Sequence, residues 1–242
     1  MPPSKIKIAS NGIRDYEYTI KKPKGSYRII ILGDSVAFGW GVDIEKTFAK
    51  RLEKLLNSKA KKKYEVINFA VPGYNLRQEI DTLKYKCLAY KPDLVIFCVQ
   101  NNDYRLLFNY HCPVKILEFI PSCLVKSCLI CTILGRYIME MDRIRDNKFE
   151  EGLNETASAI QDLSKIIEEN KVSVLFYPDI EWMAPLLKKN YLGNRIIHSG
   201  KSCFEDSRYI FKDDGHPNAL GHQKIAEELY AYLSIFVPNT KN

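Results

Sequence analysis

The chain has 242 residues, of which 46% are hydrophobic and 27% are charged, with a formal net charge of +7. This composition is typical of a soluble globular protein and argues against disorder except at the ends of the chain. The excess positive charge is concentrated at residues 21–24 and 59–63, in predicted connections. We interpret these runs as solvated surface and not as a nucleic-acid footprint.

Residues 1–242 are predicted to form a single domain, because no internal repeat, low-complexity tract or linker divides them. Residues 1–26 are interpreted as an N-terminal extension. They contain no apolar stretch of signal-peptide length, which predicts a cytoplasmic protein, with an exported parent chain as the alternative. The seven cysteines have irregular spacing and are expected to be reduced thiols. Cys128 and Cys131 form a lone CxxC that we interpret as apolar helix positions and not as zinc ligands.

Continuous apolar runs indicate the strands. Runs without polar alternation are typical of a parallel sheet that is covered on both faces. The expected strand order is 2-1-3-4-5, all parallel. The predicted strands are residues 28–32, 64–71, 93–99 and 172–177, with a weaker fifth at 207–211.

Helical periodicity fills the intervals between these runs. The first predicted helix covers residues 48–56 with Asp43 as its cap, and the others cover 76–87, 153–167 and a final segment from Pro217 to Leu233. The layout predicts an α/β protein with a flavodoxin-like three-layer α/β/α sandwich around a central parallel five-stranded sheet.

In such a sheet, ligands bind at the carboxyl ends of the strands. A serine, Ser35, follows the first strand, and Asp213 and His216 precede the last helix. A serine hydroxyl becomes a nucleophile when a histidine accepts its proton and a carboxylate orients that histidine. The alternative is local turn chemistry, with Ser35 capping a turn and His216 lying in a solvated Asp-Gly-His-Pro loop.

Acyl transfer through a serine also requires preorganised donors for the oxyanion. Three candidates follow successive strands: the backbone N–H groups of Ser35 and Gly73 and the side-chain amide of Asn102. Each also has a simpler interpretation as a turn or loop residue.

The motifs Gly33-Asp34-Ser35, Gly73, Asn102-Asp103 and Asp213-x-x-His216 resemble, in order and spacing, the four sequence blocks of the SGNH (GDSL) hydrolases. The resemblance covers both ends of the chain and most strand ends, but residues 104–170 poorly. It implies a flavodoxin-like fold, Ser35 as the nucleophile, His216 as the general base and acid, and Asp213 as its orienting partner. It further implies an oxyanion hole formed by Ser35, Gly73 and Asn102, with no metal and no organic cofactor.

The third block departs from the family pattern, because Gln100 replaces its usual glycine. This glutamine either displaces the Asn102 amide or points into the acyl pocket and narrows it. A Gly-x-Ser-x-Gly elbow is absent, since Ala37 stands two residues after Ser35, which argues against an ordinary α/β-hydrolase.

Residues 104–150 are rich in aromatic and aliphatic side chains. We expect them to cover the substrate site, with burial against the main core as the alternative. Their longest uncharged stretch is too short to cross a bilayer. His222 lacks a carboxylate three positions before it and is interpreted as a packing or helix-surface histidine. His111 and His198 have no identifiable partner.

Three function classes follow. The first is a serine ester hydrolase that acts through an acyl-Ser35 intermediate and removes small, acetyl-like groups from a carbohydrate or a related ester. The second is an O-acyltransferase with the same triad, and the third is a non-catalytic binding domain of the same fold. The expected partner is a small-molecule or carbohydrate ester, without nucleic acid and without a membrane span.

Overall fold

A four-stranded parallel sheet lies at the centre of the computed structural model, which describes residues 6–59, 61–100, 149–178, 183–189, 206–212 and 214–236. The strand order is β2-β1-β3-β4. Nearly every strand residue is buried, as the continuous apolar runs predict. The four main predicted strands and their parallel order are confirmed. Their bounds are β1 Tyr27–Gly33, β2 Tyr64–Asn68, β3 Leu94–Cys98 and β4 Ser173–Tyr177.

The fifth predicted strand, at residues 207–211, is wrong. This segment forms bends and turns with a single antiparallel bridge between Ile210 and Pro217. Its backbone groups bond to the chain just before the last helix: Phe211 N donates to His216 O at 2.8 Å, and Asn218 N to Tyr209 O at 2.9 Å. These bonds build a tight loop instead of a fifth parallel ladder.

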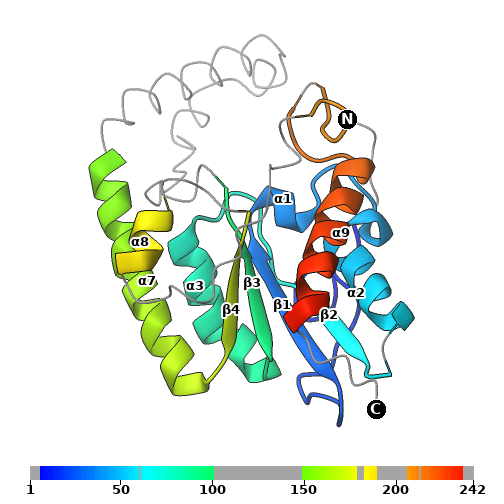
Figure 1. Ribbon diagram of the computed structural model, residues 1–242, viewed down its shortest axis with the longest axis horizontal. Coiled ribbons are helices and arrows are strands. Elements are labelled where there is room, and N and C mark those ends of the chain that lie inside the picture. Colours follow the sequence, from blue (N-terminus) through cyan, green and yellow to red (C-terminus); the bar gives the residue numbers. More distant parts are fainter. Residues whose placement is uncertain are drawn as a thin grey trace, which may run out of the picture.

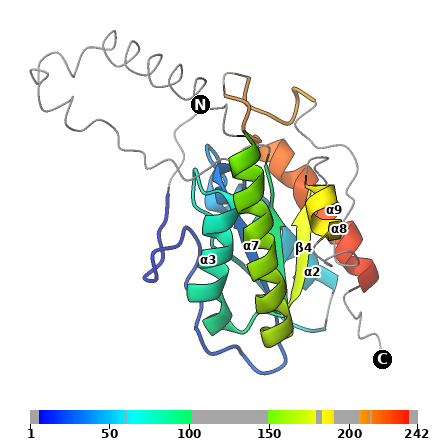
Figure 2. The ribbon, with the colours of Figure 1, turned by 90° about the vertical axis from the view of Figure 1, so that its left-hand side faces the viewer.

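Helices cover both faces of the sheet (Figure 1). Helices α2 and α9 pack together on one face, and α3 and α7 lie on the other, where Figure 2 shows them in front of the strands. Within the described ranges no helix is long and apolar enough to cross a membrane. The helices are α1 Ser35–Phe38, α2 Phe48–Lys59, α3 Leu76–Tyr85, α7 Phe149–Asn170, α8 Ala184–Lys189 and α9 Ala219–Phe236, with 3₁₀ turns η1 Ile44–Lys46 and η2 Cys87–Tyr90.

Strand β1 divides the core into two halves because its alternate side chains point to opposite faces. Ile29 and Ile31 pack into the apolar cluster that includes residues of α2 and α9. Ile30 and Leu32 pack into the other cluster, which includes residues of α3 and α7. All four side chains are essentially inaccessible to solvent, so β1 is fixed from both sides and holds whatever follows it in place.

Two helix starts differ from the predictions. Asp43 precedes η1, makes no side-chain capping bond and pairs with Lys46 instead, while Thr47 Oγ1 accepts a 3.4 Å bond from Lys50 N in the first turn of α2. The last helix begins at Ala219 and not at Pro217. Asn218 is the polar residue at this start, because its Oδ1 accepts bonds from the N–H groups of residues 220 and 221.

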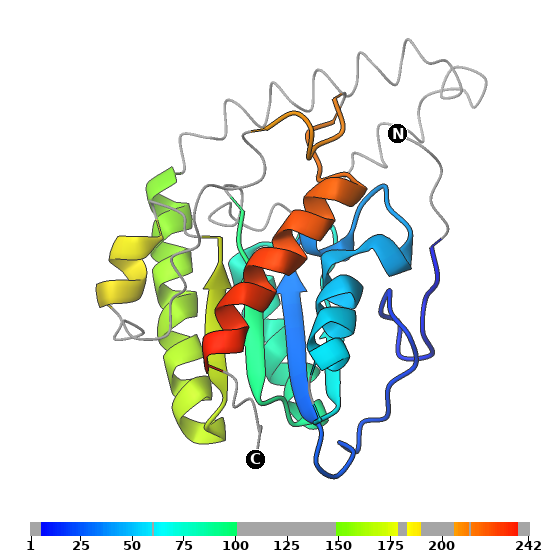
Figure 3. The ribbon, with the colours of Figure 1, turned by 45° about the vertical axis from the view of Figure 1, so that its right-hand side comes forward.

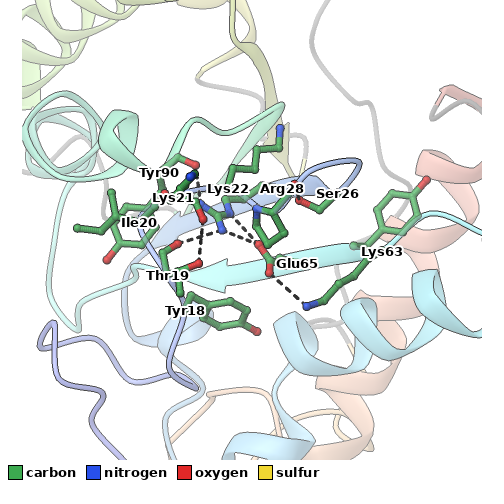
Figure 4. A network of polar contacts seen from close by, with 12 residues as sticks. Tyr18, Thr19, Ile20, Lys21, Lys22, Ser26, Arg28, Lys63, Glu65 and Tyr90 are labelled. Carbon is green, nitrogen blue, oxygen red and sulfur yellow. Dashed lines mark hydrogen bonds and ion pairs between the residues drawn. The ribbon is translucent and has the colours of Figure 1, made fainter.

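The predicted N-terminal extension is tied to the start of β1. Figure 3 shows it (dark blue) passing along the edge of the molecule and turning below the strands into β1. The buried Arg28 forms an ion pair with Glu65 at 2.6 Å (Figure 4). Its guanidinium also donates to the carbonyl oxygens of Thr19, Ile20 and Tyr90 at 3.1, 3.0 and 2.7 Å. These bonds satisfy the buried charge and fasten residues 19–20 to the sheet.

Candidate active site

Ser35 lies where β1 turns into the short helix α1. The turn requires Gly33, because a Cβ there would lie 2.6 Å from the Ala37 Cβ and 3.0 Å from the Cys98 Cβ. Asp34 fixes the first turn of α1 by accepting a 2.9 Å bond from Val36 N on its Oδ1. The strand therefore presents a half-buried serine at the carboxyl edge of the sheet.

Side chains from two other segments hold α1 at its carbonyl oxygens. Asn68, the last residue of β2, donates its amide to Ala37 O at 2.7 Å. Arg14 of the N-terminal segment donates to Phe38 O and Gly39 O, both at 2.7 Å. Asp15 accepts a 2.7 Å bond from Asn68 N and so supports the same assembly. The predicted extension therefore takes part in positioning the serine-bearing turn.

The loop before α9 positions His216. Besides the two backbone bonds described above, the Asn218 amide donates to Arg208 O at 2.8 Å and to Ile210 O at 3.1 Å. Gly221 allows this loop to pack closely on α9, since a Cβ at that position would lie 2.2 Å from Tyr209 O. His216 therefore lies on a well-braced loop at the same edge of the sheet as Ser35.

The structure brings Ser35 and His216 into direct contact. His216 Nε2 lies 2.7 Å from Ser35 Oγ, and His216 Nδ1 lies 2.7 Å from Asp214 Oδ1. Because Nδ1 faces a carboxylate, it carries the proton and Nε2 accepts the bond from the serine hydroxyl. Asp213, the predicted orienting carboxylate, lies outside the described residues, so that expectation is untested.

Asp214 is well suited to stabilise a protonated imidazole. Partial desolvation opposes its ionisation, but hydrogen bonds from the His216 backbone and ring outweigh this and hold the pKa of the Asp214 carboxyl below its usual value. The backbone bond, from His216 N to Asp214 Oδ1, measures 3.0 Å. Sequence reasoning missed this residue, although an aspartate two positions before its partner is the usual pattern of a side-chain turn.

Gly73 follows β2 as Ser35 follows β1. Val71 N donates to Gly33 O at 3.0 Å, so the segment after β2 remains paired with the last residue of β1 beyond the end of β2. Val71 lies two residues before Gly73, and Gly33 lies two residues before Ser35. Gly73 has a φ of 80°, and a Cβ at this position would meet no atom within 4 Å, which leaves space around its backbone. Gln100 stands two residues beyond Cys98, the β3 partner of Gly33. Asn102 lies outside the described residues.

The remaining histidine and metal expectations have separate outcomes. His222 is confirmed as a packing residue: its side chain is buried, its ring stacks on Phe48, and its Nδ1 accepts a 3.2 Å bond from Phe48 N. Across the residues that the structure describes, no three His, Cys, Asp or Glu side chains are grouped to hold a metal ion. The sequence candidates Cys128, Cys131, His111 and His198, with residues 104–148 of the predicted cover, lie outside these ranges.

Comparison with known proteins identifies the fold. A family model described as GDSL-like Lipase/Acylhydrolase matches residues 29–229. TesA is 15% identical, with a TM-score of 0.56 over 87% of this chain and 99% of its own. The esterase EstA from Pseudoalteromonas sp. is 14% identical, with a TM-score of 0.55 over 88% and 99%. An acetyl-xylooligosaccharide esterase, Axe2 from Geobacillus, is 14% identical, with a TM-score of 0.54 over 90% and 98%.

At these sequence identities the similar structures establish the fold alone. The match to the family model establishes that the protein belongs to that family. A search of curated protein sequences gives no match. The assignment of individual residues therefore rests on the contacts around Ser35.

Proposed function

This chain belongs to the GDSL-like lipase/acylhydrolase family, and from that premise we propose that it is a serine ester hydrolase that removes small, acetyl-like groups from a carbohydrate. The observation that carries the proposal is the contact chain Ser35 Oγ, His216 Nε2, His216 Nδ1 and Asp214 Oδ1, with both contacts at 2.7 Å. These contacts place a nucleophile, a base and an orienting carboxylate within hydrogen-bonding reach of one another.

Acylation begins when Ser35 Oγ attacks the ester carbonyl carbon and its proton passes to His216 Nε2. The imidazole is then positively charged, and the carboxylate of Asp214 stabilises that charge at Nδ1. The negative charge on the former carbonyl oxygen requires donors, for which we propose the N–H groups of Ser35 and Gly73 and the Asn102 amide. Ser35 is the first residue of α1, so its N–H has no acceptor within that helix.

Collapse of the tetrahedral intermediate breaks the ester C–O bond. His216 returns its proton to the departing alcohol oxygen, and the acyl group remains on Ser35 Oγ. A water molecule then gives a proton to His216 and adds to the acyl carbon. Loss of the serine oxygen, which recovers that proton, releases the carboxylic acid and restores the resting site. The complete cycle therefore consumes one ester and one water molecule and releases one alcohol and one carboxylic acid.

The proposed substrate class rests on the family and on weaker comparisons. EstA was solved inhibited by monoethylphosphonate, and Axe2 is named as an acetyl-xylooligosaccharide esterase. In our proposal Gln100, which follows β3 at the same edge of the sheet as Ser35, narrows the acyl pocket and favours an acetyl over a longer chain.

Hydrolysis of acetylated methyl xylopyranoside tests the proposal. We expect the wild-type protein to release acetate and the Ser35→Ala variant to lose this activity, apart from a small residual rate. The reaction is repeated with unacetylated methyl glucopyranoside as an acceptor. Transfer of acetyl to that sugar in place of acetate release would replace hydrolase by O-acyltransferase. A wild-type protein without turnover of any acetyl ester would contradict the proposal.

A further inference from the structure

Trp40 is a large exposed side chain on the turn that follows the nucleophile. Its exposed fraction is 42%, whereas neighbouring Val36 and Val42 are buried. It stands between Gly39 and Gly41, whose φ angles are 83° and 81°. Both glycines adopt a left-handed backbone conformation, so the chain turns sharply before and after Trp40. Exposure of an indole at such a turn leaves its apolar surface in water.

The Trp40 ring lies beside the proposed base. Its centroid is 6.4 Å from that of the His216 ring, with an angle of 40° between the planes. Trp40 N also donates to Ser35 O at 3.1 Å, so the same residue is bonded to the backbone of the nucleophile. The exposed indole therefore belongs to the immediate surroundings of the catalytic contact.

Buried bonds hold the turn in place on both sides of Trp40. The Arg14 guanidinium donates to Gly39 O at 2.7 Å and also to Val42 O. Gly39 is packed tightly as well, because a Cβ there would lie 2.5 Å from the Thr47 Cγ2. A surface aromatic residue on a fixed turn loses little conformational entropy when it binds a ligand.

The proton transfer from His216 to the leaving group indicates which part of a bound ester lies next to Trp40. His216 Nε2 must reach the departing alcohol oxygen, so the alcohol lies on the His216 side of Ser35. Trp40 contacts His216 on this edge. We propose that Trp40 forms a binding platform for the alcohol part of the substrate, and that this alcohol is a sugar ring. The C–H groups on one face of a pyranose pack on an indole while its hydroxyl groups remain in water.

This inference rests on the proposed function, and its test varies the alcohol at constant acyl group. Acetylated methyl xylopyranoside and ethyl acetate are compared as substrates of the Trp40→Ala variant. We expect kcat/KM to fall about tenfold for the sugar ester, equivalent to about 1.4 kcal/mol, and to change less than about twofold for ethyl acetate. Trp40→Phe, which keeps a flat ring, is expected to recover most of the loss.

The matched control is Tyr85→Ala. Tyr85 is another exposed aromatic residue, 73% accessible, but it lies at the C-terminal end of α3, far along the helix from the edge that carries Ser35. We expect this variant to hydrolyse both esters at the wild-type rate. Equal losses for the sugar ester and ethyl acetate in Trp40→Ala would show that Trp40 only supports the catalytic residues, which overturns the proposal.

A binding measurement separates this proposal from the proposed function. The chain has two tryptophans, so Trp182→Phe leaves Trp40 as the only one. In a Ser35→Ala, Trp182→Phe background, titration with acetylated methyl xylopyranoside is expected to change the Trp40 fluorescence saturably. No saturable change would overturn the platform. Hydrolysis can fail while this titration succeeds, in which case the platform stands and the hydrolase assignment falls.

Discussion

His216 lies in the loop before α9, and His222 lies in the first turn of that helix, six residues further along the chain. The side chain of His216 is 26% exposed and both of its ring nitrogens contact polar side chains. His222 is 0% exposed, and one of its ring nitrogens, Nε2, is buried without a hydrogen-bond partner among the described residues. One imidazole meets solvent and the Ser35 hydroxyl, and the other meets the core.

The difference shows how depth of burial decides what a histidine does. Burial, with smaller effects from the charges of Arg51, Arg14 and His216, lowers the pKa of His222 to about 3. His222 is therefore neutral at neutral pH and serves as a flat packing group against Phe48. His216 keeps access to water and to Ser35, which proton transfer requires.

The largest expected effect tests the functional half of this comparison. His216→Ala removes the proposed base, so kcat for an acetyl ester is expected to fall about 10⁴-fold or more. The His222→Asn variant, which keeps an acceptor for Phe48 N, is expected to retain kcat within about threefold when folded. Comparable losses of kcat in the two folded variants would erase the distinction between the histidines.

The second prediction concerns Asp214, the carboxylate that contacts His216 Nδ1. Asp214→Asn is expected to lower kcat by about 10²- to 10⁴-fold, because it removes the charge at Nδ1 that stabilises the imidazolium. Asp213→Asn is the matched control and is expected to stay within about threefold. Measurement of kcat for the two variants decides between Asp213 and Asp214. A larger loss of kcat in Asp213→Asn than in Asp214→Asn would assign the orienting role to Asp213.

The strands and the two ends of the Ser35–His216 contact could be predicted from sequence. Buried parallel strands leave continuous apolar runs, and Ser35 and His216 stand in motifs with fixed spacing. The contact between His216 Nδ1 and Asp214 could not be predicted, because the sequence alone does not show which carboxylate of an Asp-Asp-Gly-His turn approaches the ring. The pattern at 207–211 resembled a strand, but its hydrogen bonds depend on residues 216–218. Arg14 gave no local signal, since its partners at residues 38–42 are distant in the chain.

The third prediction concerns stability and the packing half of the comparison. Between pH 6.5 and about 3 the unfolded chain protonates His222 while the folded protein does not, so the free energy of unfolding falls as the pH falls. The contribution of His222 to the free energy of unfolding is complete above pH 6.5. Below pH 6.5 it decreases by no more than about 1.4 kcal/mol per pH unit.

Urea unfolding of the wild-type protein and His222→Asn at pH 7 and pH 5 measures this contribution. The buried Asp15, whose pKa is raised by desolvation, is present in both proteins, so the comparison between them cancels its effect. We expect the acid-induced loss to be larger in the wild-type protein. Identical losses would show that His222 takes up no additional proton on unfolding.

The smallest expected effect is that of Arg14, which bonds to the turn after Ser35 and whose charge also acts on His222. Arg14→Lys loses the fork that donates to the carbonyl oxygens of Phe38 and Gly39 at the end of α1, so kcat is expected to fall roughly tenfold while KM changes little. A positioning role predicts that the fall appears equally in the rate of Ser35 phosphonylation. A loss of stability with an unchanged kcat would limit Arg14 to a structural role.

Reaction of Ser35 with a fluorophosphonate tests the central claim most directly, because it reports nucleophile activation without any knowledge of the natural substrate. Peptide mass spectrometry of the wild-type protein is expected to locate one phosphonyl group on Ser35, formed at a rate that His216→Ala lowers by at least about 10²-fold. The adduct is expected to be absent from Ser35→Ala. Labelling of another residue, or equal rates in the wild-type protein and His216→Ala, would contradict activation of Ser35 by His216.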